Sequence, residues 1–419
     1  MLEKDREEIF DKLLICLSDI SKEEKRDKLS RFSPSEWPDI WEEAERQEVL
    51  SILYHIVKRM NLPIPQDLLA EGERAFLQNA LRNSLLLMEL QEILKRLNAK
   101  GVSVILLKGM HWAVVGENIG LRAMGDIDLL VQARDLEKAE EELLSLGYEP
   151  HPLNPLPGGE LGHHLFYSSR EKGFIVEIHW KLVGANYPFS IETDELWERA
   201  REVELEGIPC LTLSPLHFLV HLCLHIGAHI RAGELTLRWS NDILWWLKEY
   251  GENTDWQNLF EIVERWKASR PVYLALRLAV ELLKAKIPPD WLASIKPEDF
   301  SEEYLQLARN LLISEISGNY NPHPLAIRIA YGKGWRNKFA STIRRLFPPK
   351  ELISIHYKIP NSSSAVYLFY PVYWFQKIPK RTVEFIRCLL SSYLGDKGAK
   401  EAINRAKISV ELADWLMKQ

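Results

Sequence analysis

Two aspartates lie two residues apart in a segment that otherwise has the character of a buried β-strand. Residues 121–131 read LRAMGDIDLLV, and Asp126 and Asp128 interrupt the start of the apolar run. Because strand side chains alternate between the two faces of a sheet, we expect both carboxylates on one face. Like charges about 5 Å apart repel by roughly 3 kcal/mol at an effective dielectric constant near 20. A divalent cation such as Mg²⁺ or Mn²⁺ would relieve that repulsion, because it prefers oxygen ligands.

A third acid follows in a second predicted strand. In FIVEIHWKLV (174–183), Glu177 and His179 fall on one face, whereas Val176 and Ile178 fall on the other. Three acids on neighbouring strands suit a one- or two-metal centre for phosphoryl or nucleotidyl transfer. The alternative is that the first aspartate caps a turn and the second is solvated at a strand edge.

The elements that would position these acids change in character along the chain. Residues 1–97 carry apolar side chains at three- and four-residue spacing, which predicts a helical domain. Over 98–206, the order strand, helix, strand, helix and β-hairpin predicts a small domain with a mixed β-sheet. Helical periodicity returns in 207–315, and 316–419 is predicted to be a basic, aromatic-rich helical region.

The composition is that of an ordinary globular protein. A chain of 419 residues is too long for one compact core, and its net charge of −6 gives no overall attraction to nucleic acid or anionic membranes. The four cysteines lie far apart, which favours neither disulfides nor a thiolate zinc site and fits a reducing compartment. No signal-peptide pattern is present, and no apolar run reaches the roughly 20 residues of a spanning helix. We therefore expect a cytoplasmic protein without a membrane span.

A series of short motifs resembles a known family. Over roughly residues 98–250 the chain reads LLKG, an arginine, DIDLLV, a helical segment ending in LGY, and VEIHW. This order is similar to that of the uncharacterised nucleotidyltransferase family of the polymerase-β-like superfamily. The matching residues are Lys108, Gly109, Arg122, Gly125, Asp126, Asp128, Glu177, His179 and Trp180. The resemblance implies an α+β fold, in which a small nucleotidyltransferase-type mixed β-sheet domain is flanked by N- and C-terminal helical domains.

The resemblance also assigns roles to the acids. Asp126 and Asp128 would bind the metal ions, Mg²⁺ or Mn²⁺, that carry a nucleoside triphosphate such as ATP. Glu177 would be a further metal ligand and a base for the acceptor hydroxyl. His179 shares the face of Glu177, so it either orients that carboxylate or is a half-buried, hydrogen-bonded histidine.

Three further residues would bind the nucleotide. Gly109 would let the backbone approach the phosphates, because it lacks a Cβ atom. Lys108 and Arg122 are natural phosphate partners, and the alternative for both is an ion pair with the acid cluster. The Lys-Gly sequence stands where the superfamily usually has Gly-Ser or Gly-Gly.

Four histidines stand at four-residue spacing in PLHFLVHLCLHIGAHI: His217, His221, His225 and His229. Two histidines at this spacing can bind zinc on a helix, but no HExxH motif accompanies them. The resemblance implies instead that His225, His229 and Asp242 face the nucleotide or the acceptor. The alternative is an interhelical hydrogen bond between histidine and aspartate, and we expect the first two histidines to be packing residues.

The segment 316–383 is strongly basic, with eleven Lys or Arg residues and one acid among interleaved aromatic residues. Such a segment suits polyanions, but we favour packing against the acidic remainder of the chain, because no nucleic-acid module accompanies it. Nucleic acid is therefore not an expected partner.

These observations predict a Mg²⁺-dependent nucleotidyltransferase. It would move a nucleoside monophosphate from a triphosphate to an unidentified acceptor: a small molecule, a sugar, or a peptide or protein hydroxyl. One alternative is phosphoryl transfer at the same metal centre. Another is a non-catalytic nucleotide-binding or antitoxin-like partner protein with the same fold.

Overall fold

The computed structural model of the protein describes residues 3–418 with several gaps. The gaps are 117–118, 152–153, 155–161, 185–186, 315–349, 351–352, 355–356, 358 and 361–362. The basic segment predicted at 316–383 lies largely outside the described residues. Within them, no helix has both the length and the apolar character that crossing a bilayer requires.

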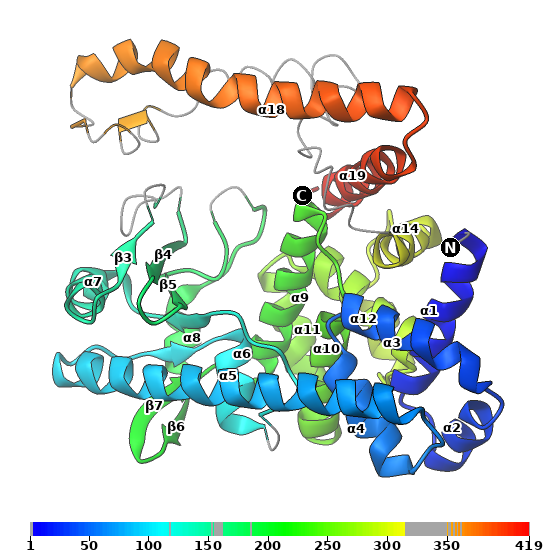
Figure 1. Cartoon of the computed structure of the whole chain (residues 1–419). Coiled ribbons are helices and arrows are strands. Elements are labelled where there is room, and N and C mark those ends of the chain that lie inside the picture. The colour runs from blue at the N-terminus through cyan, green and yellow to red at the C-terminus, as the bar shows by residue number, and fades with distance from the viewer. Residues whose placement is uncertain are drawn as a thin grey trace.

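The chain begins with helices, as its periodicity predicted. They are α1 (Glu3–Leu17), α2 (Lys22–Leu29), α3 (Trp37–Arg46), α4 (Leu50–Met60) and α5 (Gln66–Ala99). The 34-residue α5 runs across the molecule, from the N-terminal helices at one end to the sheet at the other (Figure 1). Leu68 in its first part joins the helical core, whereas Leu86, Leu90 and Leu97 join the core of the sheet. This one helix therefore connects the two hydrophobic cores.

A seven-stranded mixed sheet carries the predicted acids. Its strands are β1 (Ile105–Leu106), β2 (Ile127–Leu130), β3 (Glu149–Pro150), β4 (His164–Ser169), β5 (Phe174–His179), β6 (Arg201–Leu205) and β7 (Ile208–Thr212). Their spatial order is β3-β4-β5-β2-β1-β7-β6. β2 is parallel to β5 and antiparallel to β1, which is itself parallel to β7. The connecting helices are α6 (Lys108–Val115), α7 (Leu136–Ser145) and α8 (Thr193–Glu198). The mixed α+β fold is thus confirmed.

Two hairpins flank the centre of the sheet. The predicted β4–β5 hairpin is present, and Gly173 closes its turn with a φ of +69°. The β6–β7 hairpin was not predicted, because helical periodicity was expected to return at residue 207. Glu206 and Gly207 form its turn with φ values of +49° and +78°, as a tight two-residue hairpin turn requires. The sheet therefore continues beyond residue 206.

The described helices that follow the sheet are α9 (Pro215–Ala232), α10 (Leu237–Tyr250), α11 (Trp256–Arg265), α12 (Ser269–Leu283), α13 (Pro289–Ser294), α14 (Glu302–Ile313), α18 (Tyr370–Tyr393) and α19 (Lys397–Leu416). Of these, α12 and α14 pack against the N-terminal α1. Phe10 and Trp41 share one hydrophobic core with Phe218, Trp246 and Trp415. Helices from both ends of the chain thus meet in space. The division into four domains stays a prediction.

Candidate active site

Polar side chains gather on one face of the sheet, across β2, β5 and β4. Asp128 is the register partner of Glu177 between the parallel strands β2 and β5. His179, two residues further along β5, is the register partner of His164 on β4. Register partners and residues two apart share a face, so these four side chains lie on one side of the sheet. The intervening apolar residues of the same strands form a core with α5 and α7 on the other side.

Two cationic or hydrogen-donating groups contact the carboxylates. Lys108 Nζ lies 2.6 Å from Asp128 Oδ1 and 3.7 Å from Glu177 Oε2. His179 Nε2 lies 3.1 Å from the same Asp128 oxygen and 3.2 Å from Glu177 Oε2. The ion pair that was the alternative interpretation of Lys108 is therefore present, and His179 bridges the two acids.

The pKa values of the cluster follow from these contacts. The nearby charge of Asp128, followed by burial, raises the pKa of half-buried Asp126 to about 6. Burial opposes the ionisation of Asp128, but the charge of Lys108 and the hydrogen bond from His179 outweigh it and lower the pKa of that carboxyl. Burial also opposes the charge on Lys108, yet Asp128 and Glu177 raise its pKa to about 12. Asp126 is thus the acid whose repulsion from its neighbours is least relieved.

Helix α6 begins at Lys108, one residue before Gly109. Lys108 has a φ of +44°, a strained conformation for a residue with a Cβ atom. A Cβ atom at Gly109 would lie 2.8 Å from Arg122 Nη1 and 3.1 Å from the side chain of Met124. Close packing therefore accounts for this glycine, and its role beside the phosphates stays a prediction.

Arg122 and Asp242 bind one another. The guanidinium Nε and Nη2 donate to the two carboxylate oxygens at 2.9 and 3.0 Å, and both side chains are buried. The amide of Asn83 on α5 donates to the carbonyls of Ile119 and Arg122, which fixes the loop before β2. Asp242 on α10 therefore has an arginine partner, where a histidine was the alternative considered. The roles of both residues towards substrate stay predictions.

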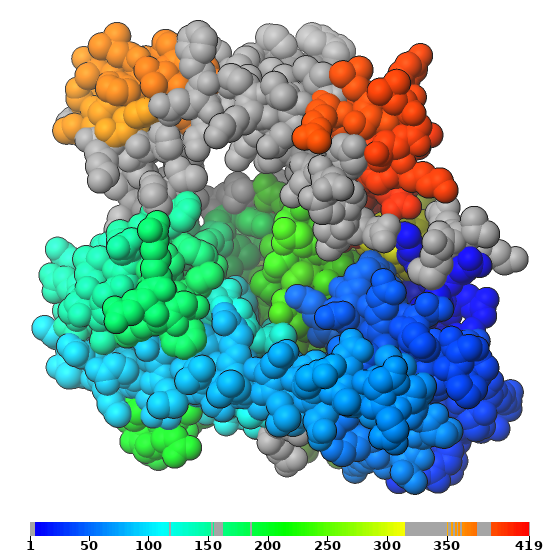
Figure 2. All heavy atoms as spheres, in the orientation of Figure 1, coloured from blue at the N-terminus to red at the C-terminus, as the bar shows by residue number. Residues whose placement is uncertain are grey.

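Two histidines of α9, His225 and His229, are close enough to Lys108 to be influenced by its charge. Burial and then the charge of Lys108 lower the pKa of His225 and of His229, the latter to about 4. His229 also stacks on Trp239 of α10, with ring centroids 3.9 Å apart. His217 accepts a hydrogen bond from Ser214 or donates one to it at 2.8 Å, and it stacks on Trp266, as a packing residue would. Figure 2 shows the green atoms of α9 set back in a recess between the strands and the N-terminal helices.

A histidine pair on the hairpin was missed by the sequence analysis. His163 Nε2 and His164 Nδ1 lie 3.0 Å apart, and burial lowers their pKa values to about 3 and about 4. The sequence did contain a signal for this pair. Two histidines, residues 163–164, stand at the start of one strand of the predicted hairpin, and EIH (177–179) ends the other. Arg238 was missed too, although it stands one helical turn before Asp242; its Nη1 donates to the carbonyl of Ala123 at 3.1 Å.

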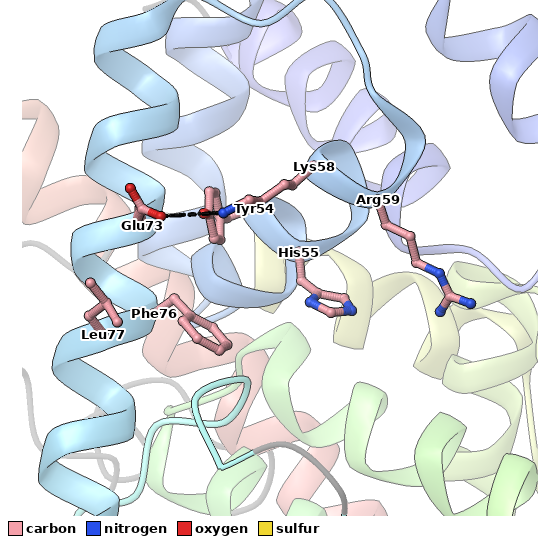
Figure 3. Close-up of a pocket in the computed structure, with 7 residues that line it drawn as sticks. All are labelled: Tyr54, His55, Lys58, Arg59, Glu73, Phe76 and Leu77. Atoms are coloured by element: carbon pink, nitrogen blue, oxygen red, sulfur yellow. Dashed lines mark hydrogen bonds and ion pairs between the residues drawn. The ribbon is translucent and has the colours of Figure 1, made fainter.

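A separate cavity of about 350 Å³ lies between α4 and α5 (Figure 3). Its lining residues are Tyr54, His55, Lys58, Arg59, Glu73, Phe76 and Leu77. Phe76 closes one side, and its ring leaves no room for a Cβ atom at Gly120. No member of the acid cluster lines this cavity, so the sheet face is the better candidate for catalysis.

Comparison with known proteins places the chain in a family. A family model described as an uncharacterised nucleotidyltransferase matches residues 33–284, more than half of the chain. The chain belongs to this nucleotidyltransferase family. The match extends beyond the expected 98–250 on both sides, so the family includes helices from before and after the sheet. A search of curated proteins finds no match. Family membership supports a transferase and, in general terms, nucleotidyl transfer.

Proposed function

We propose that the protein transfers a nucleoside monophosphate from a nucleoside triphosphate to an acceptor hydroxyl and requires Mg²⁺ or Mn²⁺. One observation carries the proposal. Asp128 and Glu177 stand side by side on paired parallel strands, next to Asp126 with its raised pKa. Membership of the nucleotidyltransferase family supports it.

The donor set fits a divalent cation. Asp128, Glu177 and His179 each offer a ligand atom, and these atoms lie within 4.8 Å of one another. The repulsion that raises the pKa of Asp126 is the kind that a hard cation on carboxylate oxygens relieves. Asp126, Asp128 and Glu177 would hold the metal. When bound, it would offset phosphate charge and stabilise the attacking and leaving oxygens.

The protein's own groups would handle the proton and the phosphates. Glu177 would accept the proton of the acceptor hydroxyl while the hydroxyl oxygen attacks the α-phosphorus. The bond between the α-phosphorus and the oxygen that bridges to the β-phosphate would break. Pyrophosphate then leaves. Lys108 would turn from Asp128 to the phosphates of the nucleotide once a cation replaces it beside the carboxylates. His225 and His229 would face the nucleotide or the acceptor.

A second candidate function follows from the same lysine. Lys108 Nζ, at 2.6 Å from Asp128 Oδ1, already supplies a cation beside the acids. A lysine that stays there would leave a non-catalytic nucleotide-binding or antitoxin-like partner protein. Phosphoryl transfer would need the same metal centre and differs in which phosphorus reaches the acceptor.

Thermal melting with each of the four triphosphates, with and without Mg²⁺, tests the proposal. We expect one triphosphate to raise the melting temperature only with Mg²⁺, in the wild type and in Asp135→Asn, which alters a buried acid outside the cluster. The double variant Asp126→Asn/Asp128→Asn should lose the shift. The same triphosphate, labelled on its α- or its γ-phosphate, is then incubated with the protein and cell extract. Transfer of the α-phosphate label to an acceptor indicates nucleotidyl transfer, and transfer of the γ-phosphate label indicates phosphoryl transfer. No Mg²⁺-dependent shift with any triphosphate would favour the non-catalytic function.

A further inference from the structure

Three imidazoles meet beside the acid cluster, and the proposed reaction leaves two of them unused. His164 begins β4, His163 directly precedes it, and His179 ends β5 opposite His164. Each of the three offers one ring nitrogen, and these nitrogens all lie within 4.8 Å of one another. The ring centroids of His164 and His179 are 5.0 Å apart. Three nitrogen donors on one hairpin are thus gathered on the sheet face that carries the carboxylates.

His179 has the arrangement of a metal-ligating histidine. Its Nε2 lies within hydrogen-bond distance of carboxylate oxygens of Asp128 and Glu177. Its Nδ1 is buried and has no hydrogen-bond partner among the residues that the structure describes. Histidines that bind metals characteristically donate one ring N–H to a carboxylate and keep the lone pair of the other nitrogen for the cation. The side chain is only 3% exposed, so water does not readily satisfy that nitrogen.

We propose that His163, His164 and His179 bind a first-row transition-metal cation of the Zn²⁺ or Co²⁺ type. Imidazole nitrogen suits these ions, whereas Mg²⁺ keeps to oxygen ligands. In a tetrahedral zinc site with Zn–N bonds of about 2.05 Å, the ligand nitrogens lie about 3.3 Å apart. His163 Nε2 and His164 Nδ1 are already 3.0 Å apart, and side-chain rotation would close the remaining separations.

The site would act on the acids through His179. A cation on one ring nitrogen fixes the proton on the other, so Nε2–H would donate to Asp128 and Glu177. The imidazole would then orient both carboxylates while leaving their remaining lone pairs for Mg²⁺. Metal binding by the three histidines does not depend on nucleotidyl transfer. The two proposals can therefore fail separately.

Titration of the full-length protein with Co²⁺ tests the site, because nitrogen-ligated Co²⁺ has visible absorption bands. We expect one equivalent to bind in the presence of excess Mg²⁺, and Zn²⁺ to displace it. The variant His163→Ala/His164→Ala should weaken binding by at least about 100-fold, because two of three protein ligands are lost. His55→Ala, which removes a histidine from α4, and Asp126→Asn should bind Co²⁺ as the wild type does.

Equal binding by the wild type and the double histidine variant would overturn the proposal, and so would displacement of Co²⁺ by Mg²⁺. If thermal melting shows that His163→Ala/His164→Ala does not fold as the wild type does, X-ray absorption of the Zn²⁺-loaded wild type identifies the ligand atoms instead. A shell with three imidazole nitrogens supports the site, and an oxygen-only shell refutes it. The Mg²⁺-dependent triphosphate shift is measured without transition metal and reports on the nucleotidyltransferase proposal alone.

Discussion

Replacing Lys108 by methionine tests whether the Lys108 ammonium group and a divalent cation compete for the same position beside the carboxylates. Lys108 Nζ contacts Asp128 at 2.6 Å and Glu177 at 3.7 Å, and the lysine side chain is 14% exposed. Methionine keeps the unbranched shape and leaves the strained φ of +44° unchanged, because both residues carry a Cβ atom. Lys108→Met therefore removes the charge and little else.

The magnitude follows from the two distances. At an effective dielectric constant of about 20, the contact with Asp128 is worth about 6 kcal/mol and that with Glu177 about 4.5 kcal/mol before desolvation. Burial of the ammonium group offsets several kcal/mol of this attraction. Removing one partner of a buried ion pair typically costs about 3–5 kcal/mol. We expect Lys108→Met to lose a similar free energy of unfolding when no metal is present.

Urea denaturation in EDTA and in Mg²⁺ measures both effects. At 100 times its dissociation constant for Lys108→Met, Mg²⁺ should stabilise this variant by about 2.7 kcal/mol and the wild type by less. Lys172→Met is the matched control. Lys172 Nζ lies 2.7 Å from Glu89 Oε1, and neither residue belongs to the acid cluster. Mg²⁺ should therefore not restore the stability that Lys172→Met loses. Equal stabilisation of the wild type and Lys108→Met by Mg²⁺ would refute the shared position. Unchanged stability of Lys108→Met in EDTA would refute the buried ion pair.

Three further predictions concern stability. The raised pKa of Asp126, about 6 against an ordinary value near 4, makes the metal-free folded state bind the proton more tightly than the unfolded state. Protonation of Asp126 should therefore add about 3 kcal/mol to the free energy of unfolding below pH 4, and this gain should be lost as the pH rises through 6. The urea midpoint should show this fall in the wild type but not in Asp126→Asn. Asp242→Ala should cost about 3–5 kcal/mol because it leaves buried Arg122 unpaired, and Arg122→Met/Asp242→Leu should recover most of the loss in the same assay. Gly109→Ala should lower stability by about 1–3 kcal/mol through contact with Arg122, whereas Gly125→Ala, where no atom lies within 4 Å of the added Cβ, should not.

Asp128, Glu177 and their strands were predictable because the signal is local, whereas Asp126 lies just before β2. The alternation in FIVEIHW places Glu177 and His179 on one face whatever the rest of the chain does. The charged REKG turn between two alternating segments likewise predicts the β4–β5 hairpin, which the structure confirms. Short-range periodicity was sufficient for both features.

The partners of the charged residues were not predictable in the same way. Arg122 and Asp242 are 120 residues apart in sequence, and their contact depends on how α10 packs against the loop before β2. Lys108 meets Asp128 only because β1 pairs with β2 in one particular register. The histidine cluster also depends on register, since a shift of one residue between β4 and β5 would turn His164 away from His179. The sequence contains these residues but not their pairing.

The pairing changes what the site requires for metal binding. Three carboxylates without a cation would bind Mg²⁺ readily, but here Lys108 already offsets part of their charge, and His179 lies within hydrogen-bond distance of two of them. A divalent cation must therefore displace the lysine, and the displaced ammonium group needs a new anionic partner. The phosphates of a nucleotide are such a partner, so metal and triphosphate should bind cooperatively, each weakly without the other. A metal affinity that is independent of triphosphate would mean that the lysine stays beside Asp128, which is the arrangement expected of the non-catalytic protein.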